Sequence, residues 1–413
     1  MAGTHTPALG LVVGGGPAPG INGVISAATI EARNRGVPVI GIQDGFRWLS
    51  QGNTEHVQQL EIADVSRIHF HGGSILRTAR DNPTKNPELL ANVIRSLDTL
   101  GVQWLLTIGG DDTAFTSRSV AAAARGRIRV VHVPKTIDND LPLTGGAPTF
   151  GFETARHCGV SIVERIMEDA HTTTRWYLLV AMGRKTGHLA LGIGKAASAT
   201  LTLIPEDFGD AKLRLSTIAD VIEGSIIKRR SLGQEHGVVI LAEGLAEQLD
   251  PTELEGIADA DRDDHGHVRL SELPLGDVLK RTLRDRFAER GIHLKITAKN
   301  MGYELRCADP IPFDAEYTRD LGYGAVSFVL DGGTEAMITR RDGCLVPIPF
   351  SDLVDPVTGR IRIRYVDVQS ESYKVARKYM IRLDPDDLRD PDQAEALARA
   401  GGTSVEDLRA RFG

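Results

Sequence analysis

The chain of 413 residues carries 48 Lys and Arg against 55 Asp and Glu, so its formal net charge is −7, and 41% of its residues are hydrophobic. This balance is that of an ordinary globular protein, and no basic excess marks a general nucleic-acid binder. The three cysteines have no CxxC spacing, and no apolar run approaches the roughly 18–20 residues that span a bilayer. We therefore expect a cytoplasmic protein of two or three domains without nucleic-acid or membrane partners.

Short apolar runs alternate with helical periodicity from the N-terminus onward. A strand is predicted at residues 9–13, then a glycine- and proline-rich turn, a helix that ends near Gly36, and a strand at 37–41. Asn86 and Pro87 are typical of an N-cap and a first helical position. Further strands are predicted at 104–108, 128–133, 176–181, 199–204 and 237–242. This alternation indicates an α/β fold with mainly parallel sheets, whose ligands lie beyond the carboxyl ends of the strands.

Two glycine-bearing loops follow predicted strands. Residues 14–20 read GGGPAPG before a helix, where the backbone can approach an anion closely, although a plain tight turn has the same composition. Pro19 stands where a GxGxxG motif needs its last glycine, and the chain contains no Walker GxxxxGK[ST] motif. Residues 109–113 read GGDDT at a helix start. This pattern fits a phosphate held through a divalent cation, or an acidic N-cap alone.

The loop at residues 134–140 reads PKTIDND and follows the strand at 128–133. It offers one cation, one hydroxyl and two carboxylates. Transfer of a phosphoryl group to an alcohol needs a base for the hydroxyl and a cation for the developing charge, and this loop holds both. An ordinary polar turn would not require this mixture.

Three later loops together offer scattered arginines and a carboxylate. They are residues 182–184, with Arg175 at the head of the preceding strand, residues 243–244, and residues 302–306. Guanidinium groups bind phosphate and carboxylates accept hydrogen bonds from hydroxyls, so a sugar phosphate fits these loops. Taken alone, such residues more often belong to an ordinary exposed surface.

Taken together and in this order, the six loops resemble those of the 6-phosphofructokinase family, diphosphate-dependent type, over roughly residues 8–385. The resemblance implies an α/β fold of two Rossmann-like domains with the active site in the cleft between them. It implies a phosphoryl-donor domain at 1–149 plus about 305–355, a fructose-6-phosphate domain at about 150–304 plus 356–390, and a C-terminal helical tail at 391–413.

The implied reaction transfers a phosphoryl group from inorganic diphosphate to the 1-hydroxyl of fructose 6-phosphate, reversibly, in glycolysis or gluconeogenesis, with Mg²⁺ as cofactor. The implied catalytic residues are Lys135, Thr136, Asp138 as the base, and Asp140. The implied donor and metal positions are Gly15, Arg80, Asp112, Thr113 and Lys135 for diphosphate, with Asp111 for the metal. The implied sugar positions are Thr136, Asp138, Arg175, Met182, Gly183, Arg184, Glu243, Tyr303 and Arg306.

The resemblance also implies contacts with a neighbouring subunit. Arg175 matches an arginine that the family lends to a partner's sugar site, which implies a homo-oligomer, either dimer or tetramer. A second lent arginine falls on Thr297, and Lys295 or Lys299 is an alternative source of that charge.

The preference for diphosphate over ATP rests on Asp112 and Lys135, since ATP-using members typically have glycine at both positions. A carboxylate at Asp112 would lie where the α-phosphate of ATP runs, and at about 4 Å and an effective dielectric of about 20 the repulsion is roughly 4 kcal/mol. Lys135 supplies a cation for the leaving phosphate. The alternative is a salt bridge between these two residues that only ties two loops together.

Other functions stay open at this point. They are an ATP-dependent phosphofructokinase, a diphosphate-dependent kinase that prefers sedoheptulose 7-phosphate, and a non-catalytic homologue, which the acids Asp138 and Asp140 argue against. His69 and His71, on one side of a possible strand, lack a third metal ligand nearby. The acids around residues 259–263 lack the glycine and glutamate of a calcium loop.

Overall fold

The structure, a computed structural model, describes residues 6–209, 212–250 and 274–413; the acidic stretch at 259–263 lies outside these residues. The chain divides into two compact units. Unit 1 comprises Met1–Ala155 and Glu304–Arg364, and unit 2 comprises Arg156–Tyr303 and Tyr365–Gly413. The chain therefore passes from unit 1 back into unit 2 after residue 364, not near residue 355 as expected. Residues 391–413, expected as a separate tail, belong to unit 2.

Unit 1 is built on a seven-stranded sheet in the order β11-β10-β5-β4-β1-β2-β3. The five inner strands are parallel, and the two edge strands are antiparallel to their neighbours. The strands are β1 (Ala8–Val13), β2 (Val39–Ile42), β3 (Val57–Leu60), β4 (Val102–Gly109), β5 (Arg129–Pro134), β10 (Ala336–Arg341) and β11 (Cys344–Pro349). The longer helices are α1 (Ile21–Asn34), α4 (Pro87–Thr99), α5 (Asp111–Ala124) and α13 (Pro312–Leu330), and the short ones are α2 (Arg47–Ser50), α3 (Ile62–Val65), α12 (Tyr303–Arg306) and α14 (Phe350–Leu353).

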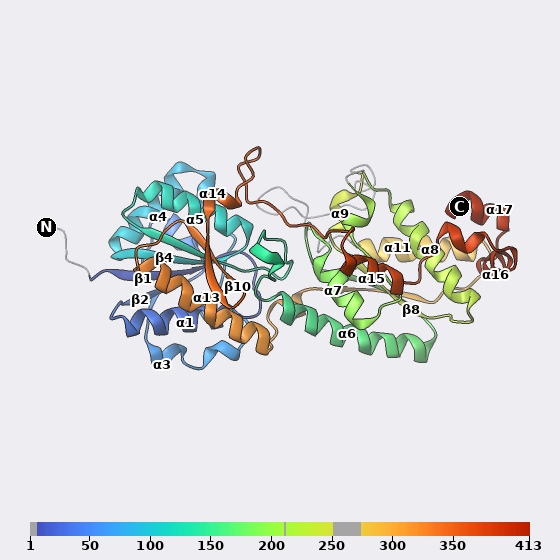
Figure 1. Ribbon diagram of the computed structural model, residues 1–413, viewed down its shortest axis with the longest axis horizontal. Helices are drawn as coiled ribbons and strands as arrows, with labels where there is room; N and C mark the ends of the chain where they lie inside the picture. The colour runs from blue at the N-terminus through green and yellow to red at the C-terminus, as the bar shows by residue number, and fades with distance from the viewer. Residues whose placement is uncertain (1–5, 210–211, 251–273) are drawn as a thin grey trace. The chain divides into compact units, whose positions relative to one another are not determined.

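Helices cover both faces of this sheet, with α4 and α5 on one face and α1 and α13 on the other (Figure 1). Alternate residues of β1 supply the two cores, because side chains of a strand point to opposite faces. Leu9 and Leu11 pack with Ile21 and Val24 of α1, while Val12 packs with helices α4 and α5 on the opposite face. The unit is a three-layer α/β/α domain.

Unit 2 contains a four-stranded, fully parallel sheet in the order β7-β8-β6-β9. The strands are β6 (Trp176–Ala181), β7 (Leu201–Leu203), β8 (Gly237–Ala242) and β9 (Ile296–Met301). The helices are α6 (Phe152–Thr173, which begins in unit 1), α7 (His188–Ala197), α8 (Leu215–Ser231), α9 (Leu245–Gln248), α11 (Leu275–Ala288), α15 (Glu371–Tyr379), α16 (Pro391–Gly401) and α17 (Val405–Phe412).

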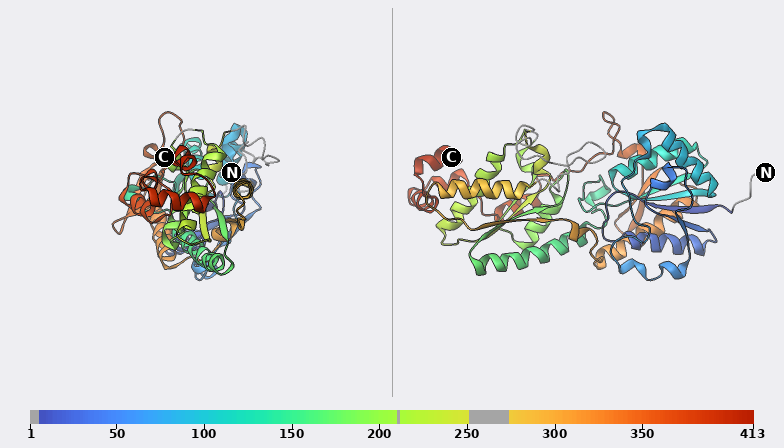
Figure 2. Two further views of the ribbon diagram at one scale, coloured as in Figure 1. Left: turned by 90° about the vertical axis from the view of Figure 1, so that its right-hand side faces the viewer. Right: turned by 180° about the vertical axis from the view of Figure 1, so that it is seen from behind.

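The C-terminal helices α16 and α17 are an integral part of unit 2. Leu397 and Leu408 are buried in the same core as Ile222 of α8, and α16 lies against α8, as the view from behind also shows (Figure 2). Burial of this apolar face explains why the segment is not an independent tail.

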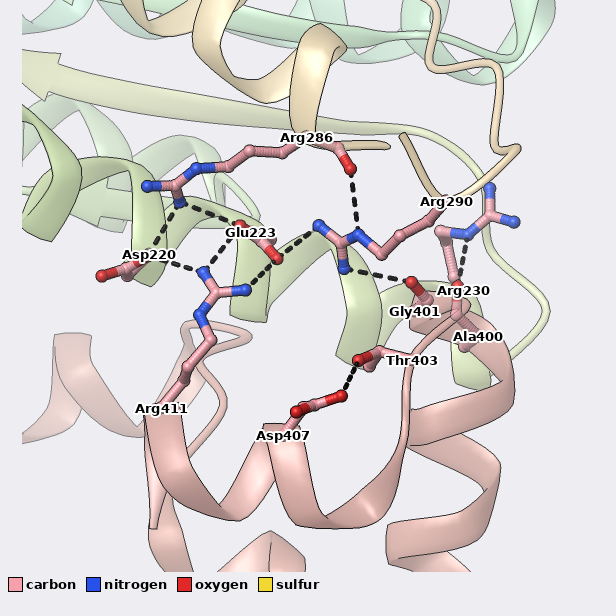
Figure 3. Close-up of polar contacts among 10 residues, drawn as sticks. All are labelled: Asp220, Glu223, Arg230, Arg286, Arg290, Ala400, Gly401, Thr403, Asp407 and Arg411. Atoms are coloured by element: carbon pink, nitrogen blue, oxygen red, sulfur yellow. Dashed lines mark hydrogen bonds and ion pairs between the residues drawn. The ribbon is translucent and has the colours of Figure 1, made fainter. Parts of the chain in front are cut away.

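An ion cluster reinforces this attachment (Figure 3). The fully buried carboxylate of Glu223 on α8 accepts hydrogen bonds from Arg286, Arg290 and Arg411, at 2.6–2.9 Å. Burial alone would raise the pKa of Glu223, but the hydrogen bonds and charges of Arg411 and Arg290 lower it to about 2. Because Arg411 belongs to α17, this pairing fastens the end of the chain to α8.

Most of the predicted elements lie where the apolar pattern puts them. The strand expected at 37–41 begins at Val39, because Pro38 has no N–H to donate to a ladder. The side chain of Asn86 caps α4 by accepting from the N–H of Glu88 at 2.8 Å. The prediction of a possible strand through His69 is wrong, because residues Ile68–Phe70 form a turn of 3-10 helix.

Helices long and apolar enough to cross a membrane are absent from the part of the chain that the structure describes.

Candidate active site

Three of the predicted loops meet at one edge of the sheet in unit 1. They follow β1, β4 and β5, which are neighbouring parallel strands, so their carboxyl ends coincide. The N–H of Gly14 donates to Ile108 O at 2.9 Å, and the N–H of Lys135 donates to Gly109 O at 2.8 Å. The sheet therefore brings together the GGGPAPG, GGDDT and PKTIDND loops.

Thr113, predicted as a donor-binding residue, packs between the first two loops. It is buried in the first turn of α5, and a Cβ on Gly14 or Gly109 would lie 2.5 Å or 2.3 Å from its Oγ1. Those two glycines are thus required by close packing. Gly15 has a φ of +81°, in the left-handed region, which is the second reason for glycine in this loop.

Lys135 is the buried cation at the centre of this edge, with only 4% of its surface exposed. Its Nζ donates to the carbonyl oxygen of Gly16, and a Cβ on Gly15 would lie 3.3 Å from that nitrogen. Burial, followed by the positive charge of Arg306, lowers the pKa of Lys135 to about 7; Asp138 acts in the opposite direction. An anion bound here would reverse the shift by supplying negative charge.

Two arginines join Lys135 on the same edge. The guanidinium of Arg306 lies against the first loop, since a Cβ on Gly16 would lie 2.1 Å from its Nη2. Exposed Arg80 follows Ala79, whose backbone bridges to Gly14, and its charge also lowers the pKa of Lys135. The structure thus gathers three cations around the glycine loop, and Arg306 is one of them although it is predicted on the sugar side.

The acids of the second loop stand in the first turn of α5, with Gly110 as the N-cap. Asp111 is half-buried and Asp112 is exposed. The structure shows no ion pair between Asp112 and Lys135, both of which lie in its described part, so the loop-tying salt bridge is absent. Clusters of three or more potential metal ligands do not occur among the described residues.

The third loop holds Asp138 between two anchors. The N–H of Asp138 donates to Thr136 Oγ1 at 3.0 Å, and the hydroxyl of buried Thr149 donates to the Thr136 carbonyl at 2.7 Å. Asn139 has a left-handed φ of +57° and accepts at Oδ1 from the N–H of Thr149 at 3.0 Å. Asparagine tolerates this conformation better than most residues. The half-buried carboxylate of Asp138 projects from this constrained turn.

A buried polar network supports the base of the loops. His132 Nε2 lies 3.0 Å from the Gly109 carbonyl oxygen, and its Nδ1 lies 2.8 Å from Thr107 Oγ1. Burial lowers the pKa of His132 to about 3, so the ring is neutral near pH 7. Its one proton resides on Nε2, which faces a carbonyl, and Nδ1 accepts from the Thr107 hydroxyl, which lies 2.6 Å from Ser117 Oγ. His132 Nε2 and the backbone N–H of Lys135 therefore both donate to the carbonyl oxygen of Gly109.

Three predicted sugar loops meet in unit 2. They follow β6, β8 and β9, with Ala181 in register with Ala242 and Met301. Buried Glu243 accepts at Oε2 from the N–H of Gly183 at 3.1 Å. The Met182 side chain packs on Gly302, where a Cβ would lie 2.8 Å from its Cε. These contacts place residues 182–184, Glu243 and exposed Tyr303 at one sheet edge.

Arg175 lies at the opposite, amino end of β6 from residues 182–184. Six residues of strand separate the two sites, about 20 Å at the usual rise, so Arg175 does not join its own chain's sugar loops. Its Nε is buried without a hydrogen-bond partner. The neighbouring Lys295 carbonyl accepts from the Trp176 N–H at 2.8 Å, so of the two lysines weighed above Lys295 stands at this end.

Two contributors to the site escape sequence reasoning. His132 looks like an ordinary strand residue, although its alternation with Val131 and Val133 inside a buried strand is a weak sign of a polar role. Arg364, which holds Asn139, lies 225 residues away in sequence, and no local pattern connects the two.

Comparisons with known proteins give consistent results. A family model described as phosphofructokinase matches residues 8–329. The chain is 52% identical to a pyrophosphate–fructose 6-phosphate 1-phosphotransferase of Thermotoga maritima, over 98% of this chain and 97% of that protein. It is 51% identical to a protein of the same name from Naegleria fowleri, over 99% and 95%. It is 29% identical to an ATP-dependent 6-phosphofructokinase of Natranaerobius thermophilus, over 84% and 94%.

Solved structures agree on the fold. A pyrophosphate-dependent phosphofructokinase from Nitrosospira multiformis superposes with a TM-score of 0.69 at 18% identity, over 91% of this chain and 90% of that one. One from Marinobacter aquaeolei gives a TM-score of 0.68 at 17% identity, over 95% and 91%. At these identities the likeness concerns the fold alone.

Proposed function

The chain belongs to the phosphofructokinase family, and we propose that it acts as the diphosphate-dependent enzyme of that family. It transfers a phosphoryl group from inorganic diphosphate to the 1-hydroxyl of fructose 6-phosphate, giving fructose 1,6-bisphosphate and phosphate. The near full-length similarity to two enzymes of that name supports this assignment. The observation that carries it in the structure is the buried cation Lys135 against the glycine loop, at the meeting point of three strand ends.

Asp138 is the base of the proposed reaction. It takes the proton of the 1-hydroxyl while that oxygen attacks the terminal phosphorus of diphosphate, and the bond from this phosphorus to the bridging oxygen breaks. The anchoring of the loop at Thr136 and Asn139 supports this role, because a base must be held in one orientation. Thr136 and Asp140 orient the acceptor on either side.

Lys135 and Arg80 bind the donor and stabilise the charge that develops on the leaving phosphate. Lys135 is well suited to this role because it is already desolvated, and electrostatic stabilisation is stronger in such a site than in water. The backbone of Gly15 and the buried Thr113 shape the donor pocket. Arg306, which lies in unit 1 against Gly16, carries the remaining positive charge and is proposed for the 6-phosphate of the sugar.

The divalent metal that this chemistry uses is proposed to be Mg²⁺, held by Asp111. The described residues fit such an ion, because Mg²⁺ typically takes one or two carboxylates and completes its shell with water and substrate phosphates, not with a cluster of protein ligands. When bound, it neutralises charge on the diphosphate oxygens.

Asp112 selects against nucleotides. It is exposed in the first turn of α5, beside Asp111 and apart from Lys135, so its charge is not neutralised by that lysine. A donor with a third phosphate and a nucleoside would meet this carboxylate, whereas diphosphate is short enough to avoid it.

In unit 2, the proposed sugar residues are Met182, Gly183, Arg184, Glu243 and Tyr303. Glu243 accepts from sugar hydroxyls and also fixes the Gly183 backbone. Arg175 and Lys295, at the other end of this sheet, are proposed to serve the sugar site of a second subunit, so the enzyme is a homo-oligomer. None of its three cysteines, all of which the structure describes, forms a disulfide, and this supports a reducing compartment such as the cytoplasm.

The test is an assay that measures the bisphosphate formed from each acceptor, with diphosphate or ATP as donor: fructose 1,6-bisphosphate from fructose 6-phosphate, and sedoheptulose 1,7-bisphosphate from sedoheptulose 7-phosphate. The expected result is turnover with diphosphate and fructose 6-phosphate at a higher kcat/KM than any other pair. A higher kcat/KM with ATP would overturn the donor assignment, and a higher one with the seven-carbon sugar would overturn the acceptor.

A further inference from the structure

We propose that Arg364 is a positioning residue for the catalytic aspartate, because it fixes the backbone of the PKTIDND loop directly after Asp138. The inference rests on the proposed role of Asp138 as base. Arg364 is not part of any motif in the sequence.

Arg364 makes hydrogen bonds to two successive backbone carbonyls of the loop. Its Nε and Nη2 donate to the carbonyl oxygen of Asn139 at 3.1 and 2.9 Å, and Nη2 also contacts Asn139 Oδ1. Its Nη1 donates to the Ala147 carbonyl at 2.9 Å, and its own backbone N–H donates to the Asp140 carbonyl at 2.7 Å. One residue therefore satisfies both carbonyls that follow Asp138.

With these contacts, the loop is held on both sides of Asp138. On the amino side, Thr149 and Thr136 fix the chain just before Asp138. On the carboxyl side, Arg364 donates to the carbonyl oxygen of Asn139, whose backbone is left-handed, and so favours this conformation of the turn. Without Arg364, the nearly buried oxygens of Asn139 would lose their charged donor, and the turn that aims Asp138 would be released on one side.

Only a guanidinium fits this arrangement. The contacts use three nitrogens in one plane to reach carbonyls from two segments, Asn139 and Ala147. A lysine carries the same charge on a single nitrogen and cannot make them together. A role in charge balance alone predicts that lysine substitutes well, whereas a positioning role predicts that it does not.

The experiment compares Arg364→Ala, Arg364→Lys and the matched control Arg362→Ala, whose exposed side chain lies two residues away and donates to the Asp352 carbonyl. Steady-state kinetics are measured with whichever donor the wild type uses, so a wrong donor assignment does not affect the result. We expect Arg364→Ala to lower kcat roughly 100-fold, the size of a misplaced reacting group, with KM for the donor nearly unchanged. Arg364→Lys should remain impaired, and Arg362→Ala should match the wild type.

Chemical rescue separates positioning from general damage. Added guanidinium at a non-denaturing concentration should restore a large part of kcat to Arg364→Ala, and methylammonium at the same concentration should not. Hydrogen exchange of residues 136–140 should rise in the Ala variant and return with guanidinium. The proposal is overturned by wild-type kcat in Arg364→Ala, by full activity in Arg364→Lys, or by a loss of kcat that guanidinium leaves unchanged.

Discussion

The loops of the two units are supported in different ways. In unit 2, the loops after β6, β8 and β9 are held mainly by one another: Met182 N–H donates to Met301 O at 3.0 Å, Glu243 N–H to Ala181 O at 2.9 Å, and Gly183 N–H to the Glu243 side chain. In unit 1, the loops are joined by backbone hydrogen bonds of the same kind, and side chains from elsewhere support them in addition, namely His132 below Gly109 and Arg364 beside Asn139.

This difference follows from the chemistry assigned to each unit. A sugar has many hydroxyls and can be bound by polar groups at the ends of a regular sheet. Phosphoryl transfer instead needs a desolvated cation and an oriented base, so unit 1 buries Lys135 and constrains Asp138. The unit 1 loops should consequently be more sensitive to changes in their supports, and the following experiments test that.

The largest effect is expected for the base itself. Asp138→Asn removes the proton acceptor but keeps the size of the side chain, so kcat should fall by about 10²–10⁴-fold. The surface variant Asp331→Asn, far along the chain in a salt bridge with Arg35, is the control and should keep wild-type kcat. Steady-state kinetics measure both. Turnover of Asp138→Asn close to the wild type would show that the base lies elsewhere.

Lys135 predicts a pH dependence of donor binding. Its pKa in the free site is lowered to about 7 by burial, so the ammonium is present below pH 7 and is lost as the pH rises. The apparent affinity for diphosphate should therefore weaken above pH 7 by up to about tenfold per pH unit, because binding then requires proton uptake.

The matched variant is Lys135→Arg, whose guanidinium stays charged throughout this range. The affinity for diphosphate is measured by calorimetric titration of both proteins between pH 6 and 9. Because the protonation of diphosphate itself affects both proteins alike, the difference between the two profiles reports the protonation of Lys135. Parallel profiles in the two proteins would contradict the assignment of the step to Lys135.

Substitutions of His132 test the buried polar network that supports the GGDDT loop. His132→Gln can still place a donor near the Gly109 carbonyl, whereas the shorter side chain of His132→Asn reaches only toward Thr107. We expect the Asn variant to raise KM for diphosphate about tenfold, the scale of a lost supporting contact, and the Gln variant to raise it less. KM for fructose 6-phosphate should stay constant in both. Equal effects of the two variants would mean that the Gly109 contact is unimportant.

The smallest effect on catalysis is expected in unit 2, at the ion cluster of Figure 3. Glu223→Gln leaves three arginines facing a neutral buried group, and breaking such a pair costs about 3 kcal/mol of unfolding free energy. The exposed Glu235→Gln is the control. Urea unfolding should separate the two, while kcat stays near that of the wild type, because Glu223 supports no site loop.

The same cluster predicts acid sensitivity. Because the pKa of Glu223 is lowered to about 2 in the folded protein, its contribution to stability is complete above its ordinary pKa of 4.5 and is lost as the pH falls toward 2. Wild-type stability should fall over this range by more than that of Glu223→Gln. Equal slopes would indicate that folding does not lower the pKa of Glu223.

The α/β fold and the loops at the strand ends could be predicted from the sequence, because apolar periodicity and local motifs such as GGDDT and PKTIDND depend on neighbouring residues. The strands β3, β9, β10 and β11 were missed. The partly exposed residues of β3, β9 and β11 give no continuous apolar run, and the apolar run of β10 is only three residues long, 336–338. The supports contributed by His132 and Arg364 could not be predicted. They depend on packing between segments that only the tertiary fold brings together.

The central claim is that the donor is chosen in unit 1, by Asp112 and Lys135. The most direct measurement is the ratio of kcat/KM for diphosphate to kcat/KM for ATP, in the wild type and in the double variant Asp112→Gly, Lys135→Gly. We predict a ratio that strongly favours diphosphate in the wild type and falls at least about tenfold in the variant, as expected when about half of a 4 kcal/mol repulsion is removed. A wild type that prefers ATP, or a ratio that the double variant leaves unchanged, would contradict the account.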